Sequence, residues 1–161
     1  MSLSTYPFDR NRAARVISEA VRSSWASKWW LKPEYIEGRY NKEEVEQAFN
    51  EVLEVFNDEW LEGLMSKFVK GEARDHFYLR EFMGGGLYPL AIFFSLGQDL
   101  LAIKSLEGYN QLKERLRSDT GWMSAAFEAE FAAHCARQGL HVRLYPAIPN
   151  SDRRPDLLVT A

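Results

Sequence analysis

The sequence has a single cysteine, Cys135, among its 161 residues, so no disulfide can form within the chain. Proteins without disulfides are typical of a reducing compartment. The N-terminal residues also lack the apolar run that a secretory signal peptide requires. We therefore expect a cytoplasmic protein.

Long apolar segments are missing as well. The most apolar stretch, residues 87–103, is interrupted by Gly97, Gln98 and Asp99. A helix that crosses a bilayer needs about 20 consecutive, mostly apolar residues. The sequence therefore predicts no membrane span and no membrane partner.

The sequence has no large excess of positive or negative charge. It contains 20 Lys and Arg residues and 23 Asp and Glu residues, and its formal net charge is −3. Proteins that coat nucleic acid with their whole surface are strongly basic, so the composition argues against that class but leaves a local basic patch open. What the chain does have is 46% hydrophobic and 14% aromatic residues, which is enough for a packed core.

Helical patterns dominate the first two thirds of the chain. The clearest helix begins after Asn41, whose side chain can cap it, and the region ends at Gly63 or Gly71. Further helices are predicted over residues 10–24, 87–105 and 108–118. Apolar residues of the clearest helix recur at spacings of three and four, which places them on one stripe: Val45, Phe49, Val52, Phe56 and Trp60.

The last third changes character. An Ala-rich helix over residues 124–138 is followed by Gly139, a typical C-terminal cap. Residues 140–146 alternate apolar and polar side chains, which predicts a half-buried strand, and residues 155–160 predict a second, apolar strand. We therefore expect an α+β protein with a helical domain over residues 1–118 and one helix and two strands over residues 119–161.

Asp156 stands at the start of the second predicted strand, directly after Pro155. Proline suits a strand start, and an acid in this position is held at the margin of a sheet. Carboxylate oxygens are the ligands that Mg²⁺ prefers, and such a cation can polarise a phosphodiester. One carboxylate is not a metal site, however. The nearest upstream acids are Glu128 and Glu130 in the Ala-rich helix.

The order of helix, strand, loop and Pro-Asp strand resembles the opening of a PD-(D/E)XK nuclease domain, over roughly residues 88–161. The resemblance matches Asp156 to the metal-binding Asp of that family. It matches Glu128 to the helix Glu, because Glu128 directly follows Phe127. It implies a restriction-endonuclease-like α/β core, Mg²⁺ or Mn²⁺ as cofactor, nucleic acid (DNA in the first place) as partner, and phosphodiester hydrolysis as activity.

Arg153 and Arg154 flank Asp156 in the sequence. If Asp156 binds a metal ion, these two side chains stand where the backbone of a nucleic acid must pass. A solvated charged surface is the alternative interpretation.

The family also needs an acid-any-Lys strand, and none follows Asp156 in this sequence. If the resemblance holds, we expect the chain to be the N-terminal part of a longer nuclease and to be inactive by itself. Strands without sheet neighbours leave backbone groups unpaired, so either a disordered C-terminus or a homodimer through the edges of the C-terminal strands is expected.

Other interpretations remain open. Asp156 can simply cap a turn while Glu128 and Glu130 face solvent. The chain would then be a non-enzymatic helical module that binds a protein through the aromatic residues of 25–30 or through the joint at 84–90.

Two further charged clusters have ordinary explanations. The spacing of Glu72, Asp75 and His76 matches no known zinc signature. The basic side chains of the helix predicted over residues 108–118 are interpreted as a solvated face: Lys113, Arg115 and Arg117.

Overall fold

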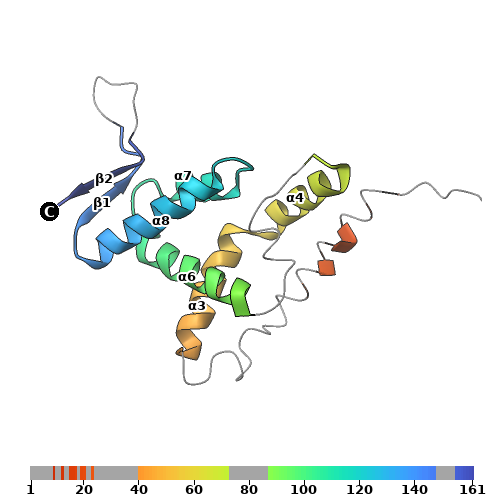
Figure 1. The fold of residues 1–161 in the computed structure, drawn as a ribbon, viewed down its shortest axis with the longest axis horizontal. Coiled ribbons are helices and arrows are strands. Elements are labelled where there is room, and N and C mark those ends of the chain that lie inside the picture. Colours follow the sequence, from red (N-terminus) through yellow and green to blue (C-terminus); the bar gives the residue numbers. More distant parts are fainter. Residues whose placement is uncertain are drawn as a thin grey trace, which may run out of the picture. The chain divides into compact units, whose positions relative to one another are not determined.

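A computed structural model describes residues 9, 12, 15–17, 19–20, 23, 40–72, 87–147 and 155–161 (Figure 1). The chain forms two compact units. One comprises residues 1–29 and 57–84, and the other comprises residues 30–56 and 85–161.

The first unit contains helix α4 (Asp58–Lys70). Asn57 caps it, since its Oδ1 accepts a hydrogen bond from the N–H of Trp60 at 3.1 Å. Gly71 ends it with φ of 74°, a left-handed conformation that glycine adopts without strain. One face of α4 is buried: Leu61, Leu64 and Met65.

In the described part of the second unit, four helices and two strands follow one another in the order α3 (Lys42–Val55), α6 (Leu87–Ile103), α7 (Tyr109–Arg117), α8 (Trp122–Arg137), β1 (His141–Leu144) and β2 (Leu157–Thr160). This arrangement confirms the coarse α+β class: helices predominate, and the strands form one two-stranded antiparallel sheet. Among the described residues, no helix has the length and apolar character needed to cross a membrane.

The predicted cap at Asn41 is confirmed, because its Oδ1 accepts from the N–H of Glu43 at 2.8 Å. The single helix predicted to run on through Trp60 is wrong. Helix α3 stops at Val55 and Phe56 leaves the helical region, with φ of −98° and ψ of 60°. Asn57 then caps a new helix, so the apolar residues that recur in the sequence are divided between two helices.

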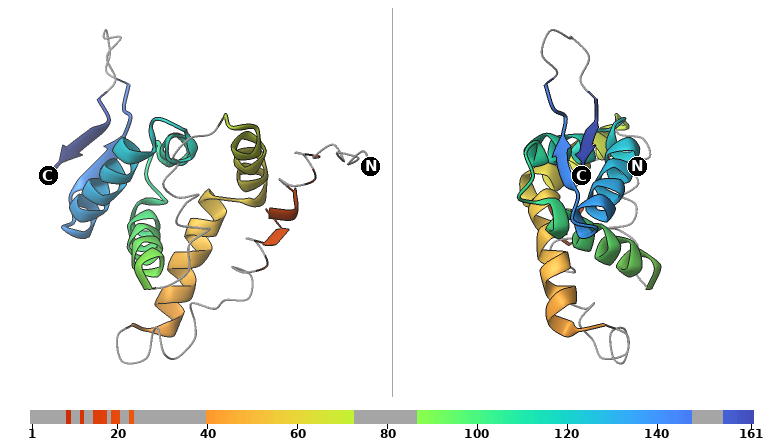
Figure 2. Two further views of the ribbon diagram at one scale, coloured as in Figure 1. Left: turned by 45° about the vertical axis from the view of Figure 1, so that its right-hand side comes forward. Right: turned by 90° about the vertical axis from the view of Figure 1, so that its left-hand side faces the viewer.

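The core of the second unit lies where α6 packs between α3 and α8. Figure 2 shows α3 and α6 side by side. They approach so closely at Gly97 that an added Cβ would lie 2.1 Å from the carbonyl oxygen of Ala48. Helices α7 and α8 flank the predicted domain boundary at residue 118, yet they pack together and share this core.

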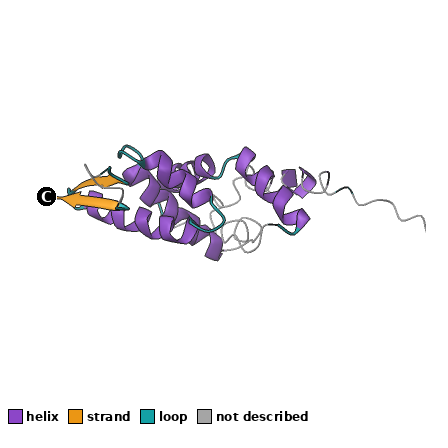
Figure 3. Ribbon diagram, turned by 90° about the horizontal axis from the view of Figure 1, so that it is seen from above, coloured by secondary structure: helices purple, strands orange, loops and turns teal. Residues whose placement is uncertain are grey.

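The two strands lie side by side at the C-terminal end of the chain (Figure 3), and both contact α8. The register pairs His141 with Thr160 and Leu144 with Leu157. The alternation predicted for residues 140–146 holds for the buried Val142 and Leu144.

Three details of the strand predictions are wrong. Leu140, assigned to the apolar face of the first strand, is exposed and precedes β1. Tyr145, assigned to the polar face of the first strand, is buried, because its φ of 50° breaks the alternation and turns the side chain inward. The second strand is only half buried, and Leu158 is exposed. Helix α8 packs against both strands, yet the side chains of β2 remain half-buried or exposed.

Candidate carboxylate site

Glu128 and Asp156, the two acids selected from the sequence, meet at Arg115. Nη1 of Arg115 donates to Oε2 of Glu128 at 2.8 Å and to Oδ1 of Asp156 at 2.9 Å. The three side chains come from α7, from α8 and from the residue that precedes β2. The fold therefore brings together residues that are 28 positions apart in the sequence and places a cation between them.

Glu128 is buried, with only 8% of its surface exposed, and both of its oxygens are satisfied. Ser124 lies one helical turn earlier on α8, and its hydroxyl donates to Oε1 of Glu128 at 2.8 Å. The hydroxyl of Tyr145 donates to Oε2. A buried carboxylate is stable only when it is paired and hydrogen-bonded, and Glu128 meets both conditions.

Tyr145 joins the two segments that carry the acids. Its backbone N–H donates to the carbonyl oxygen of Asp156 at 2.9 Å, which extends the β1–β2 ladder by one residue. Its hydroxyl reaches Glu128 on α8. Burial raises the pKa of Tyr145, and the hydrogen bond to Glu128 raises it further, so the hydroxyl remains a proton donor at neutral pH.

Arg115 is held by more than its two ion pairs. Nη2 donates to the hydroxyl of Ser124 at 2.7 Å, and the guanidinium carbon lies 5.1 Å from the ring centroid of Tyr145, within the range of a cation–π contact. Burial acts to lower the pKa of Arg115, but Tyr145, Asp156 and Glu128 outweigh it, and the pKa is raised. Arg115 is therefore a permanent cation of this cluster.

The chemical type of the two acidic side chains suits a divalent cation, because carboxylate oxygens are its preferred ligands. Mg²⁺ is commonly held by one or two carboxylates and keeps several waters, and two carboxylates converge here at the edge of a sheet. The position between them is taken by a guanidinium. Within the part of the chain that the structure describes, no group of three or more His, Cys, Asp or Glu residues gathers around one point.

Glu130, the other acid considered from the sequence, is not part of this cluster. Glu130 is exposed on α8, while Glu128 is buried. Arg153, Arg154 and His76 lie outside the described residues, as do residues 25–30 and 84–86.

Three residues of the cluster were missed from the sequence: Arg115, Ser124 and Tyr145. The interpretation of Arg115 as part of a solvated face is wrong, since its side chain is 30% exposed and binds both acids. Only Ser124 carries a local signal, because residues four apart on a helix share a face. Arg115 is 41 residues from Asp156, and no periodic pattern connects them.

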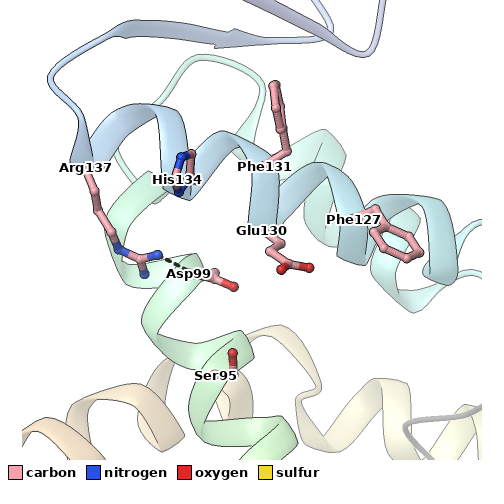
Figure 4. A pocket seen from close by; sticks show the side chains of 7 residues that line it. All are labelled: Ser95, Asp99, Phe127, Glu130, Phe131, His134 and Arg137. Carbon is pink, nitrogen blue, oxygen red and sulfur yellow. Dashed lines mark hydrogen bonds and ion pairs between the residues drawn. The ribbon is translucent and has the colours of Figure 1, made fainter.

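A second candidate site is a pocket of about 490 Å³ between α6 and α8 (Figure 4). Nη1 of Arg137 binds Oδ1 of Asp99 at 2.8 Å on its wall. Burial raises the pKa of Asp99, and the contact with Arg137 opposes this. The pocket is lined by acidic, basic and aromatic side chains together with one serine: Ser95, Asp99, Phe127, Glu130, Phe131, His134 and Arg137.

The chain matches no protein-family model, no curated protein and no solved structure.

Proposed function

We propose that this chain supplies two carboxylates to the divalent-metal centre of a nuclease-like protein of the PD-(D/E)XK type, which hydrolyses phosphodiester bonds in DNA. The observation that supports it is the convergence of Glu128 and Asp156 on one cation, Arg115. In this proposal α8, β1 and β2 are the first elements of a restriction-endonuclease-like core.

Asp156 and Glu128 would hold Mg²⁺ or Mn²⁺, which supplies Lewis-acid chemistry toward the phosphodiester when it is bound. Asp156 is the accessible ligand, because its side chain is 62% exposed. Tyr145 and Ser124 fix the orientation of Glu128 through hydrogen bonds to its two oxygens. No acid-any-Lys sequence follows Asp156 within these residues, and we expect residues 1–161 alone to cleave no DNA.

Arg153 and Arg154 would bind the phosphate backbone, since they flank Asp156 in the sequence. The test is fluorescence anisotropy of a labelled DNA duplex titrated with the protein at low ionic strength. We expect binding that weakens with salt and that falls markedly in the double variant Arg153→Ala/Arg154→Ala.

A matched control is Arg12→Ala/Arg15→Ala, which removes the same charge from exposed N-terminal residues. DNA binding in this control should match the wild type. Absence of DNA binding at low salt would contradict the proposal. An equal loss of affinity in both double variants would also contradict it, because the affinity would then not depend on the residues beside Asp156.

A non-enzymatic interaction module is the second candidate. Met123, Phe127 and Phe131 recur every four residues on α8 and are 56%, 67% and 54% exposed. An apolar stripe on the surface of a helix is typical of a contact with another protein, and a second copy of this chain is the partner that we test. Light scattering of the wild type and of Phe127→Ser/Phe131→Ser is the experiment. A dimer that dissociates in the double variant favours this function.

A further inference from the structure

Arg115 occupies the position that a metal ion bound to both acids would need. We propose that Arg115 is a built-in cation of the Glu128–Asp156 site: it pairs with both carboxylates and compensates one of their two negative charges, and a divalent cation binds only when the guanidinium leaves them. This inference rests on the proposed function. It adds a residue that controls occupancy of the metal site.

The geometry shows direct competition for the same oxygens. One nitrogen, Nη1 of Arg115, contacts Oε2 of Glu128 and Oδ1 of Asp156 at 2.8 and 2.9 Å. A cation that bridged the two acids would bind these oxygens, so the guanidinium and the metal ion exclude one another. Arg115 is held in place by Ser124 at 2.7 Å and by the ring of Tyr145.

Charge explains why the site needs a resident cation. The side chain of Glu128 is 9% exposed, and an isolated buried carboxylate carries a large desolvation cost. Removing one partner of a buried ion pair leaves the other charge without compensation. Arg115 stabilises Glu128 in this way, and a divalent cation is the alternative that offers at least the same charge.

The two contacts of Arg115 differ in strength. Asp156 is 62% exposed, and an ion pair to an exposed carboxylate is screened by water and contributes little. The contact with Glu128 is shielded from solvent and reinforced by Ser124, which binds both side chains. The guanidinium therefore separates from Asp156 at a low cost in free energy. The stronger contact with Glu128 is the one that must break before the metal ion can bind both acids.

The test compares Mn²⁺ binding to the wild-type chain with binding to Arg115→Ala and Arg115→Gln, using the electron paramagnetic resonance signal of free Mn²⁺. We expect weak binding by the wild type and binding tighter by about tenfold or more in both variants, because a cation in contact with both ligands has been removed. The double variant Arg115→Ala/Asp156→Asn should lose this gain.

Arg117→Ala is the matched control. Arg117 lies on the same helix, and it binds the carbonyl oxygens of Glu54 and Val55 and the side chain of Glu114. Its removal changes the net charge equally but leaves Glu128 and Asp156 untouched, so Mn²⁺ affinity should stay at the wild-type value. Equal Mn²⁺ affinity in the wild type and in the Arg115 variants overturns the proposal, as does an equal gain in Arg117→Ala.

Thermal unfolding gives a second readout. Arg115→Ala should unfold at a lower temperature than the wild type, and Mn²⁺ should raise its melting temperature more than that of the wild type. Arg115→Gln keeps a donor for Glu128 and serves as the milder variant. If neither variant folds alone, folding restored by Mn²⁺ supports the proposal, and folding that Mn²⁺ does not restore overturns it.

These measurements separate the inference from the function on which it rests. A chain that gains a Mn²⁺ site when Arg115 is removed but never binds DNA contradicts the nuclease proposal and leaves the role of Arg115 standing. A chain that binds DNA through Arg153 and Arg154 but gains no Mn²⁺ affinity contradicts the role of Arg115 alone.

Discussion

Tyr145 and Glu128 are joined by a hydrogen bond between a buried phenol and a buried carboxylate, which links the end of β1 to the middle of α8. The same Tyr145 donates its backbone N–H to Asp156. One residue thus fixes the distance between the helix and the start of the second strand, and with it the spacing of the two candidate ligands.

Tyr145→Phe should destabilise the protein by about 1–3 kcal/mol, because it removes a donor from a buried carboxylate. Chemical denaturation followed by circular dichroism measures this. Tyr40→Phe is the control, since Tyr40 is 46% exposed and lies outside the cluster. A loss in Tyr145→Phe no larger than in Tyr40→Phe would show that the hydroxyl contributes nothing to the free energy of unfolding.

Gly97→Ala should destabilise the second unit by about 1–3 kcal/mol or more, as overpacking does. The added Cβ would lie 2.1 Å from the carbonyl oxygen of Ala48, so α3 and α6 must separate. Gly63→Ala is the matched control: Gly63 is also helical, but among the described residues no atom beyond its own helix backbone lies within 4 Å of its added Cβ. That variant should gain roughly 0.5–1 kcal/mol from reduced chain entropy. Thermal melts of both variants should therefore shift in opposite directions.

Asp99 should give the folding stability a measurable pH dependence. Burial raises its pKa above the usual 3.8, with Arg137 opposing this shift and Glu130 adding to it. The folded state therefore holds the proton at pH values where the unfolded state has lost it, and the contribution of Asp99 to stability falls as the pH rises through the raised pKa.

Asp99→Asn removes this titration. The stability of the wild type relative to Asp99→Asn should be highest in acid, below pH 3.8, and should decline toward neutral pH. Urea denaturation at a series of pH values measures the difference. A difference that is constant with pH, or that grows as the pH rises, contradicts the direction assigned to Asp99.

Val159→Pro should dissociate a homodimer formed through the edge of β2. Tyr145 donates to Asp156, so hydrogen-bonded pairs alternate along the ladder, and the N–H groups of Leu157 and Val159 point away from β1. Proline at position 159 removes one of these outward donors and leaves the β1–β2 bonds in place.

Light scattering of the wild type, of Val159→Pro and of Val159→Ala tests this contact. The alanine variant retains the N–H and should remain dimeric. A monomeric wild type excludes the strand-edge dimer. A dimer that survives Val159→Pro but not Phe127→Ser/Phe131→Ser assigns the contact to α8.

Local patterns predicted several elements well. The cap at Asn41, the helices α6, α7 and α8 and the strand after Gly139 follow from side-chain periodicity and from capping chemistry, which act over a few residues. Periodicity failed at Phe56 because the apolar stripe continues through the break. The local signal for the start of a second helix was Asn57 followed by the acidic residues Asp58 and Glu59.

The candidate site was likewise predicted from the sequence only in part. By itself the sequence placed Glu128 on a helix and Asp156 at the start of a strand, since both positions follow from neighbouring residues. Only the tertiary structure decided that these two acids meet, that Glu128 is buried while Glu130 is exposed, and that Arg115 lies between the ligands. These contacts join residues 13 to 41 positions apart, and such pairings depend on how the elements pack rather than on any local pattern.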